Sequence, residues 1–264
     1  MGARRESVAS VRRRAGEILR ALEAEYPGAK CALDWSTPLQ LAVATILSAQ
    51  CTDKRVNLVT PALFARFPDA AAFAAAEEGE LEEAIRTCGF FRNKARNIRA
   101  LGAELVRSHG GELPRDPAVL ESLPGIGRKT GNLLAAELYG IPSLIVDTHF
   151  IRMSNRLGLL EAPTRDPKAI ERRVQALVPQ EAWTRWSHLM VTHGRRRCPA
   201  RKPDCANCPI AGWCPGAEGA AGKTACKTRF HCVEKVPKHV SIVWKKCRNT
   251  FPLCGKNRGR DAKP

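Results

Sequence analysis

The chain has 264 residues, of which 44% are hydrophobic and 26% charged. This composition supports one large or two small globular domains with a hydrophobic core, and it excludes a chain that is disordered throughout or collagen-like. The 43 Lys and Arg residues against 26 Asp and Glu give a net charge of +17, which favours a polyanionic partner such as nucleic acid.

Two features of the chain bear on its location. The N-terminal segment carries arginines but no apolar core and no small-residue cleavage site, so it does not read as a secretory signal. The longest apolar run, near residues 39–47, is far shorter than the roughly 20 residues that a membrane span needs. We therefore expect a cytoplasmic protein with no membrane partner.

Helices should dominate the fold, because alanine, leucine and arginine fill long stretches while aromatic residues make up only 6% of the chain. We predict an all-α fold whose helices are separated by short turns rich in Pro, Gly and Asp. The predicted helices span residues 6–25, 38–49, 54–66, 80–87, 94–109 and 117–122, and further helices begin at residues 128, 148, 167 and 182. After Cys214 helical periodicity is lost, so we expect a boundary near Pro215 and a flexible basic tail over residues 216–264.

Residues 123–132 read LPGIGRKTGN and join two predicted helices through a tight turn. Gly125 and Gly127 can adopt a positive φ and bring bare backbone close to a ligand, while Ile126 between them can fill the groove between the helices. The N–H groups that open the second helix carry the positive end of its dipole, which suits a phosphate. A plain helix–helix turn would explain one glycine, but not two glycines followed at once by two cations. The segment therefore predicts a phosphate-binding hairpin.

A lysine and an aspartate near this hairpin are candidates for chemistry. Lys129 follows the hairpin directly, and Arg128 beside it, the helix N-terminus and partial burial would all favour the unprotonated, nucleophilic amine. Asp147 ends an apolar run where a new helix begins, and by itself it would usually be interpreted as an N-cap. It could also receive a proton or stabilise positive charge that develops on a substrate.

Four cysteines within seventeen residues form the pattern C-x6-C-x2-C-x5-C: Cys198, Cys205, Cys208 and Cys214. Disulfides are disfavoured in a reducing cytosol, so a metal site is expected. The spacing alone leaves zinc and an iron–sulfur cluster equally open, because both accept four cysteines. Two cations between the first two cysteines, Arg201 and Lys202, are well placed to bind DNA phosphates.

The hairpin, the segment VDTH that contains Asp147, and the four-cysteine loop together resemble the endonuclease III branch of the helix-hairpin-helix DNA glycosylase superfamily. The resemblance covers roughly residues 8–215. It implies a helical barrel domain with the hairpin over residues 31–141, and an iron–sulfur cluster domain built from residues 1–30 and 142–215. It also implies a [4Fe-4S] cluster on the four cysteines, with Lys129 as the nucleophile and Asp147 as its partner.

The activity that the resemblance implies is that of a bifunctional DNA glycosylase and abasic-site (AP) lyase in base excision repair. Such an enzyme takes double-stranded DNA with an oxidised pyrimidine, such as thymine glycol, or with an abasic site, and cleaves the strand by β-elimination through a lysine Schiff base. We expect it to act as a monomer at the bacterial nucleoid, without a nucleotide cofactor.

A glycosylase must also extrude its target nucleotide and fill the gap that this leaves in the stack. The segment Leu47–Gln50 resembles the family segment whose glutamine enters the gap, and Gly89–Phe91 resembles the family's apolar wedge, with phenylalanine where leucine is common. Without the resemblance, Gln50 would be a helix-terminal polar residue and Phe90 ordinary core packing. The expected DNA contacts are Gln50, Phe90, Gly125, Gly127, Arg128, Arg201 and Lys202.

Other activities remain open at this point. Close relatives of the branch act on ultraviolet pyrimidine dimers, and a noncatalytic DNA-binding protein with a zinc site would share the hairpin and the cysteines. The related adenine glycosylases are disfavoured by Lys129 and by the absence of a second folded domain. Residues 217–224 fit a relaxed P-loop pattern, but they follow the cysteine loop rather than a strand, and the four further cysteines of the tail match no zinc template.

Overall fold

The computed structural model describes residues 6–218, and all regular elements among them are helices, which confirms the predicted all-α fold. No helix in this part of the chain combines the length and the apolar character that crossing a bilayer requires. The predictions for residues 219–264, which concern the basic tail, its cysteines and most of the P-loop-like segment, lie outside the described residues.

The helices follow one another in this order: α1 (Val8–Glu25), α2 (Pro38–Ser48), α3 (Asp53–Arg66), α4 (Ala70–Ala75), α5 (Glu80–Ala84), η1 (Arg86–Cys88), α6 (Phe91–His109), α7 (Pro117–Ser122), α8 (Arg128–Tyr139), α9 (Thr148–Arg156), α10 (Pro167–Gln175), η2 (Gln180–Ala182), α11 (Trp183–Arg196), η3 (Ala211–Trp213) and α12 (Pro215–Glu218). The sequence did not predict α4, and α6 begins three residues before the expected Lys94.

Polar caps explain where most of the helices begin. A Ser, Thr or Asp side chain accepts an N–H of the first turn of α1, α2, α3, α4, α7, α9 and α10. Three of these helices, α2, α7 and α10, also place proline in the first turn, where its missing N–H costs nothing. Each cap stabilises its helix by about 1 kcal/mol, so these boundaries are encoded locally.

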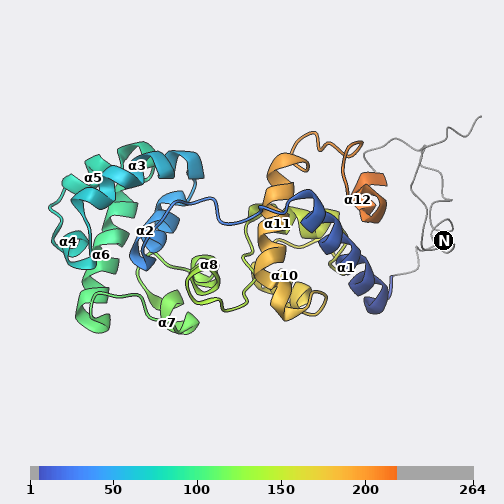
Figure 1. Ribbon diagram of the computed structural model, residues 1–264, viewed down its shortest axis with the longest axis horizontal. Coiled ribbons are helices and arrows are strands. Elements are labelled where there is room, and N and C mark those ends of the chain that lie inside the picture. Colours follow the sequence, from blue (N-terminus) through green and yellow to red (C-terminus); the bar gives the residue numbers. More distant parts are fainter. Residues whose placement is uncertain (1–5, 219–264) are drawn as a thin grey trace, which may run out of the picture. The chain divides into compact units, whose positions relative to one another are not determined.

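Two hydrophobic cores organise the described chain, one in each of the two groups of helices that Figure 1 shows. The first core uses residues between Leu33 and Ala135 and defines a first lobe, α2 to α8. The second core joins residues 11–26 to residues 144–210 and defines a second lobe, α1 with α9 to α11. Here α1 packs against α11 although the two are far apart in the sequence. The two cores use the same stretches of chain as the two expected domains. That each stretch forms a separate domain stays a prediction.

Candidate active site

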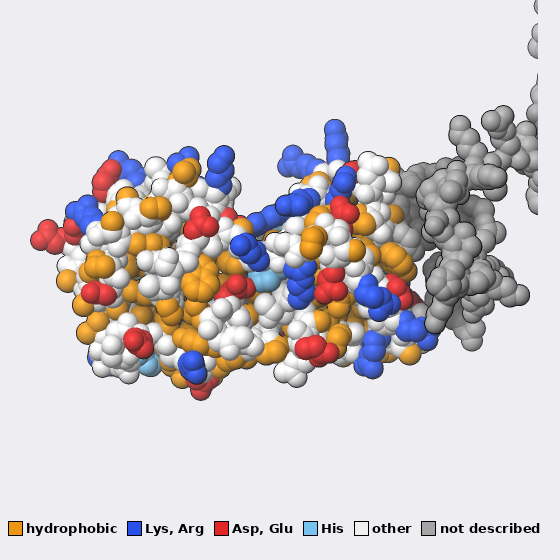
Figure 2. All heavy atoms as spheres, viewed as in Figure 1, with side chains coloured by type: hydrophobic (Ala, Val, Ile, Leu, Met, Phe, Trp, Pro, Cys, Tyr) orange, Lys and Arg blue, Asp and Glu red, His pale blue; other side chains and the backbone are white. Residues whose placement is uncertain are grey.

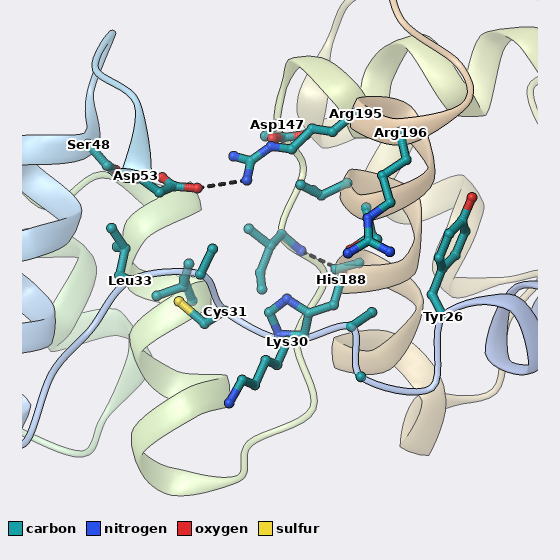
Figure 3. Close-up of a pocket in the computed structure, with 18 of the residues that line it drawn as sticks. Tyr26, Lys30, Cys31, Leu33, Ser48, Asp53, Asp147, His188, Arg195 and Arg196 are labelled. Carbon is teal, nitrogen blue, oxygen red and sulfur yellow. Dashed lines mark hydrogen bonds and ion pairs between the residues drawn. The ribbon is translucent and has the colours of Figure 1, made fainter. Parts of the chain in front are cut away.

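A cleft of about 610 Å³ lies between the two lobes, and both Lys129 and Asp147 line it. Its walls are the chain that links α1 to α2, the first turns of α3 and α8, the segment before α9, and one face of α11. Figure 2 shows Lys and Arg side chains near the hollow between the lobes, and Figure 3 shows the cleft in close-up. The structure therefore brings the two candidate catalytic residues to one cavity.

The two candidates are held in different ways. Asp147 is half-buried and is the N-cap of α9, where its Oδ1 accepts the backbone N–H of Phe150 at 2.7 Å. Lys129 is the second residue of α8, and its side chain is exposed. The cap fixes the Asp147 carboxylate at the cleft wall, whereas the lysine amine can move and reach a substrate.

The expectation that Lys129 is partly buried was wrong, because its side chain is exposed. The lysine lies on the surface because the hairpin turns the first residues of α8 outward. The Arg128 guanidinium is bound by Glu171 of α10, with Nε 2.8 Å from Oε2 and Nη2 3.1 Å from Oε1. These hydrogen bonds raise the pKa of Arg128 and tie α8 to the second lobe. A DNA contact by Arg128 stays a prediction.

The hairpin has the expected helix–turn–helix form, but its two glycines differ. Gly125 has φ +76°, and a Cβ there would lie 2.9 Å from Cβ of Asn97, so the turn requires glycine. Gly127 has φ −96° and ψ 179°, and the expectation of a positive φ at this residue was wrong. Ile126 is 3% exposed and fills the first core, as expected. No side chain caps α8, which leaves the N–H groups of its first turn to a ligand.

This difference predicts opposite behaviour for two alanine variants. Gly125→Ala should destabilise the protein by about 2–4 kcal/mol, because it adds left-handed strain and a steric clash. Gly127→Ala should change the free energy of unfolding by less than about 1 kcal/mol, because no atom lies within 4 Å of its Cβ position. The added methyl group should nevertheless weaken duplex DNA binding about tenfold by blocking the approach of a phosphate.

Urea unfolding and DNA titration at one fixed salt concentration measure both effects. Equal loss of stability in the two variants, or undiminished DNA binding by Gly127→Ala, would contradict the roles assigned to these glycines.

Two polar pairs across the cleft were missed by the sequence analysis. Arg195 of α11 donates to Asp53 of α3, with Nη1 2.7 Å from Oδ2, and this pair joins the two lobes at the rim of the cleft (Figure 3). The second pair joins α11 to α8, with Nε2 of His188 2.6 Å from Oε1 of Glu137. No local pattern relates residues so far apart in the sequence, so only the packing of α11 against the first lobe reveals these pairs.

Three of the residues predicted to contact DNA share an unusual backbone conformation. Gln50, Phe90 and Lys202 are the non-glycine residues with positive φ in the described range, at 52°, 48° and 52°, and all three were predicted to contact DNA. Phe90 is 62% exposed, which rules out ordinary core packing. Gln50, Phe90 and Gly125 also line one hollow of about 240 Å³. Strained backbone of this kind concentrates at functional sites, although contact with DNA stays a prediction for each residue.

The four cysteines are all half-buried and carry free thiols. Among the described residues, no three Cys, His, Asp or Glu side chains already form a metal-ligand group. The donor set nevertheless suits a metal that prefers sulfur. Nη1 of Arg156 lies 3.0 Å from Sγ of Cys198, a contact that would stabilise a thiolate, and the same guanidinium donates to the carbonyls of Pro199 and Ala200. Binding of a metal by these thiols would release their protons, as it does at any thiolate site.

Comparison with known proteins gives consistent matches. Residues 43–180 match the model of the HhH-GPD superfamily base excision DNA repair protein family. The chain is 50% identical over 214 residues to "Endonuclease III" of Synechocystis, a match that covers 81% of this chain and 97% of that protein. It is 37% identical to "Endonuclease III" of Escherichia coli, over 75% of this chain and 93% of that protein.

Solved structures agree with these matches. The "Structure of a non-covalent Endonuclease III-DNA Complex" superposes with a TM-score of 0.76 at 37% identity, over 79% of this chain and 97% of that chain. The "Structure of a Trapped Endonuclease III-DNA Covalent Intermediate: Estranged-Adenine Complex" gives the same score and identity and covers 98% of its chain.

Proposed function

Because the chain belongs to the endonuclease III family of helix-hairpin-helix DNA repair proteins, we propose that it is a bifunctional DNA glycosylase and AP lyase of base excision repair that removes oxidised pyrimidines. The observation that carries the proposal is the joint placement of Lys129 and Asp147 on one cleft beside the hairpin. An amine and a carboxylate are the two groups that this chemistry needs.

The chemistry begins with nucleophilic attack by Lys129 on C1′ of the extruded nucleotide. The bond from C1′ to the base breaks as the N–C1′ bond forms, and the base leaves with the electron pair and takes up a proton from water. The Asp147 carboxylate stabilises the positive charge that develops on the sugar and accepts a proton from the attacking amine. The ring opens to a Schiff base as the proton held by Asp147 passes to O4′. Loss of a 2′ proton to water then expels the 3′ phosphate with the C3′–O electron pair, and hydrolysis of the imine releases the enzyme.

Duplex DNA would lie across the cleft, bound mainly through its phosphates. The uncapped N-terminus of α8 binds one phosphate through backbone N–H groups, with Gly125 and Gly127 allowing close approach. Gln50 and Phe90 fill the space that the extruded nucleotide leaves, and Arg201 with Lys202 binds further phosphates. The partner is double-stranded DNA with a damaged pyrimidine or an abasic site, and the protein acts on it as a monomer in the bacterial cytoplasm, at the nucleoid, without a nucleotide cofactor.

The four cysteines would hold a [4Fe-4S] cluster. When bound, the cluster braces the loop that carries Arg201 and Lys202, while Arg156 donates to the sulfur of Cys198 and to two loop carbonyls.

Removal of one ligand should therefore release the cluster. Cys208→Ser is expected to lose the absorbance at about 400 nm and to bind fewer than about four irons per chain. Visible spectroscopy with iron and zinc analysis checks this, with Cys31→Ser, a half-buried cysteine of the first lobe, as the matched control. A colourless wild-type protein with one zinc per chain would contradict the cluster and favour a zinc site.

Borohydride trapping of the wild-type protein tests the function itself. Hydride reduces a Schiff base to a stable amine, so trapped protein–DNA adducts are expected on duplexes that carry an abasic site and on duplexes that carry thymine glycol. Trapping on the abasic duplex alone would keep the lyase and move the substrate toward pyrimidine dimers. The absence of adduct on both would overturn the proposal in favour of a DNA-binding or monofunctional protein.

A further inference from the structure

A buried lysine stands outside the chemistry described above. Lys94 lies in the first turn of α6, and only 4% of its surface is exposed, which is rare for a lysine. Its Nζ donates to the carbonyl oxygen of Leu47 at 2.8 Å and to that of Cys88 at 3.0 Å. Burial lowers the pKa of this amine, while the thiols of Cys51 and Cys88 act in the opposite direction.

Both carbonyls belong to the two turns that carry the candidate wedges. Leu47 lies at the end of α2, three residues before Gln50, and Cys88 ends η1, two residues before Phe90. The Lys94 backbone N–H also donates to the carbonyl of Phe90, at 3.1 Å. A single residue therefore hydrogen-bonds both turns, and it lines the same hollow as Gln50 and Phe90.

The two turns need such support because their backbones are strained. Gln50 and Phe90 have φ of 52° and 48°, and neither is a glycine. Left-handed residues of this kind persist only where the surroundings hold them. The end of a helix also leaves carbonyl groups without an intrahelical partner, and inside a core these groups require a donor. The Lys94 ammonium supplies two N–H groups at this point.

Packing alone does not account for a lysine here. Ala95, Ile98 and Leu101 on the same helix are fully buried and apolar, so an apolar side chain would suit this core. Taking an ammonium out of water costs free energy, so its presence here fits a role in fixing the arrangement of its neighbours. Here its neighbours are the turns at Gln50 and Phe90.

We propose that Lys94 is a positioning residue that holds the Gln50 turn and the Phe90 turn together, in the one arrangement that inserts both side chains into distorted DNA. The proposal rests on the proposed function, because it assigns Gln50 and Phe90 to the gap in the duplex. Lys94 touches neither the sugar nor the base in this scheme and acts only through the two turns.

Lys94→Met is the decisive variant, because it keeps the length of the side chain and removes both donated hydrogen bonds. We expect KM for an abasic duplex to rise about tenfold while kcat changes less than about twofold. The fluorescence change of a 2-aminopurine placed opposite the abasic site, which reports unstacking by the wedges, should fall to less than about one third of its wild-type value. Ile98→Val, one turn along α6 and equally buried, is the matched core control and should leave KM and fluorescence unchanged.

A double-mutant cycle separates positioning from general stability. If Lys94 acts through the turns, Lys94→Met should add less than about twofold to KM in a protein that already carries Gln50→Ala and Phe90→Ala. A full tenfold increase in that background, or a wild-type KM and fluorescence change in folded Lys94→Met, would overturn the proposal.

Further controls distinguish a folding defect in the variant from a failure of the proposed function. If Lys94→Met does not fold, Lys94→Gln takes its place: it is one bond shorter, cannot reach both carbonyls at once, and should raise KM about threefold. A wild-type KM in Lys94→Gln would overturn the proposal. Loss of borohydride trapping in the wild type would refute the proposed function, whereas the absence of a 2-aminopurine response in the wild type would refute the insertion on which Lys94 acts.

Discussion

Lys129→Ala is expected to abolish the borohydride-trapped adduct and to slow strand cleavage at an abasic site by at least about 10³-fold, because it removes the only group assigned to attack C1′. The side chain is exposed, so its truncation should change the free energy of unfolding by less than about 0.5 kcal/mol. DNA binding should weaken only slightly, because the hairpin binds phosphate mainly through backbone N–H groups. Single-turnover cleavage assays with a thermal melt measure both quantities.

A second lysine in the same cleft provides the matched comparison. Lys30 also lines the cleft, on the segment that links α1 to α2, and it is exposed like Lys129 (Figure 3). Lys30→Ala should still give the trapped adduct. An adduct that survives in Lys129→Ala and disappears in Lys30→Ala would show that Lys30, and not Lys129, is the nucleophile.

Asp147→Asn is expected to lower turnover of a thymine glycol duplex by about 10²–10⁴-fold, because an amide can neither accept a proton nor stabilise a cation as a carboxylate does. Asparagine caps a helix as well as aspartate does, so the stability of α9 should be retained. Affinity for the duplex should stay within about threefold of wild type, since Asp147 is assigned no phosphate contact.

The alanine variant separates the two roles of Asp147. Asp147→Ala loses both the carboxylate and the hydrogen bond to the N–H of Phe150, so it should show the same loss of turnover and, in addition, about 1 kcal/mol of lost stability. Turnover close to wild type in Asp147→Asn, measured under the conditions where Asp147→Ala is inactive, would reduce Asp147 to a helix cap.

Local chemistry explains why much of the fold was predictable. Asp116 with Pro117, Asp147, and Asp166 with Pro167 specify the beginnings of α7, α9 and α10 within a few residues, and the structure places the helices there. The hairpin was equally legible, because a glycine-rich turn between two helical segments is a local pattern of the sequence. The helix α4 was missed because its six residues are mostly alanine and carry little periodicity.

What could not be predicted depends on contacts between distant segments. Arg128 reads as a free cation beside the hairpin, and only the packing of α10 reveals that Glu171 binds it. Nothing in the local sequence marks Lys94 as buried, yet its amine donates to carbonyls at the end of α2 and in η1. Exposure of Lys129 likewise follows from how the hairpin lies against its surroundings. These side chains have long-range partners, which no window of local sequence contains.

The second core is built from two stretches of chain that are far apart in the sequence, and this has a consequence for synthesis of the protein. The first core is formed by one continuous stretch, from Leu33 to Ala135, and can therefore consolidate while the ribosome is still translating the rest. The apolar face of α1, with Ile18 and Leu22 fully buried in the finished protein, must wait until residues 144–210 have left the exit tunnel. A first lobe that folds on its own would follow an exposed apolar helix throughout this interval, and nascent chains that stall after the hairpin would then be targets for chaperones and proteases.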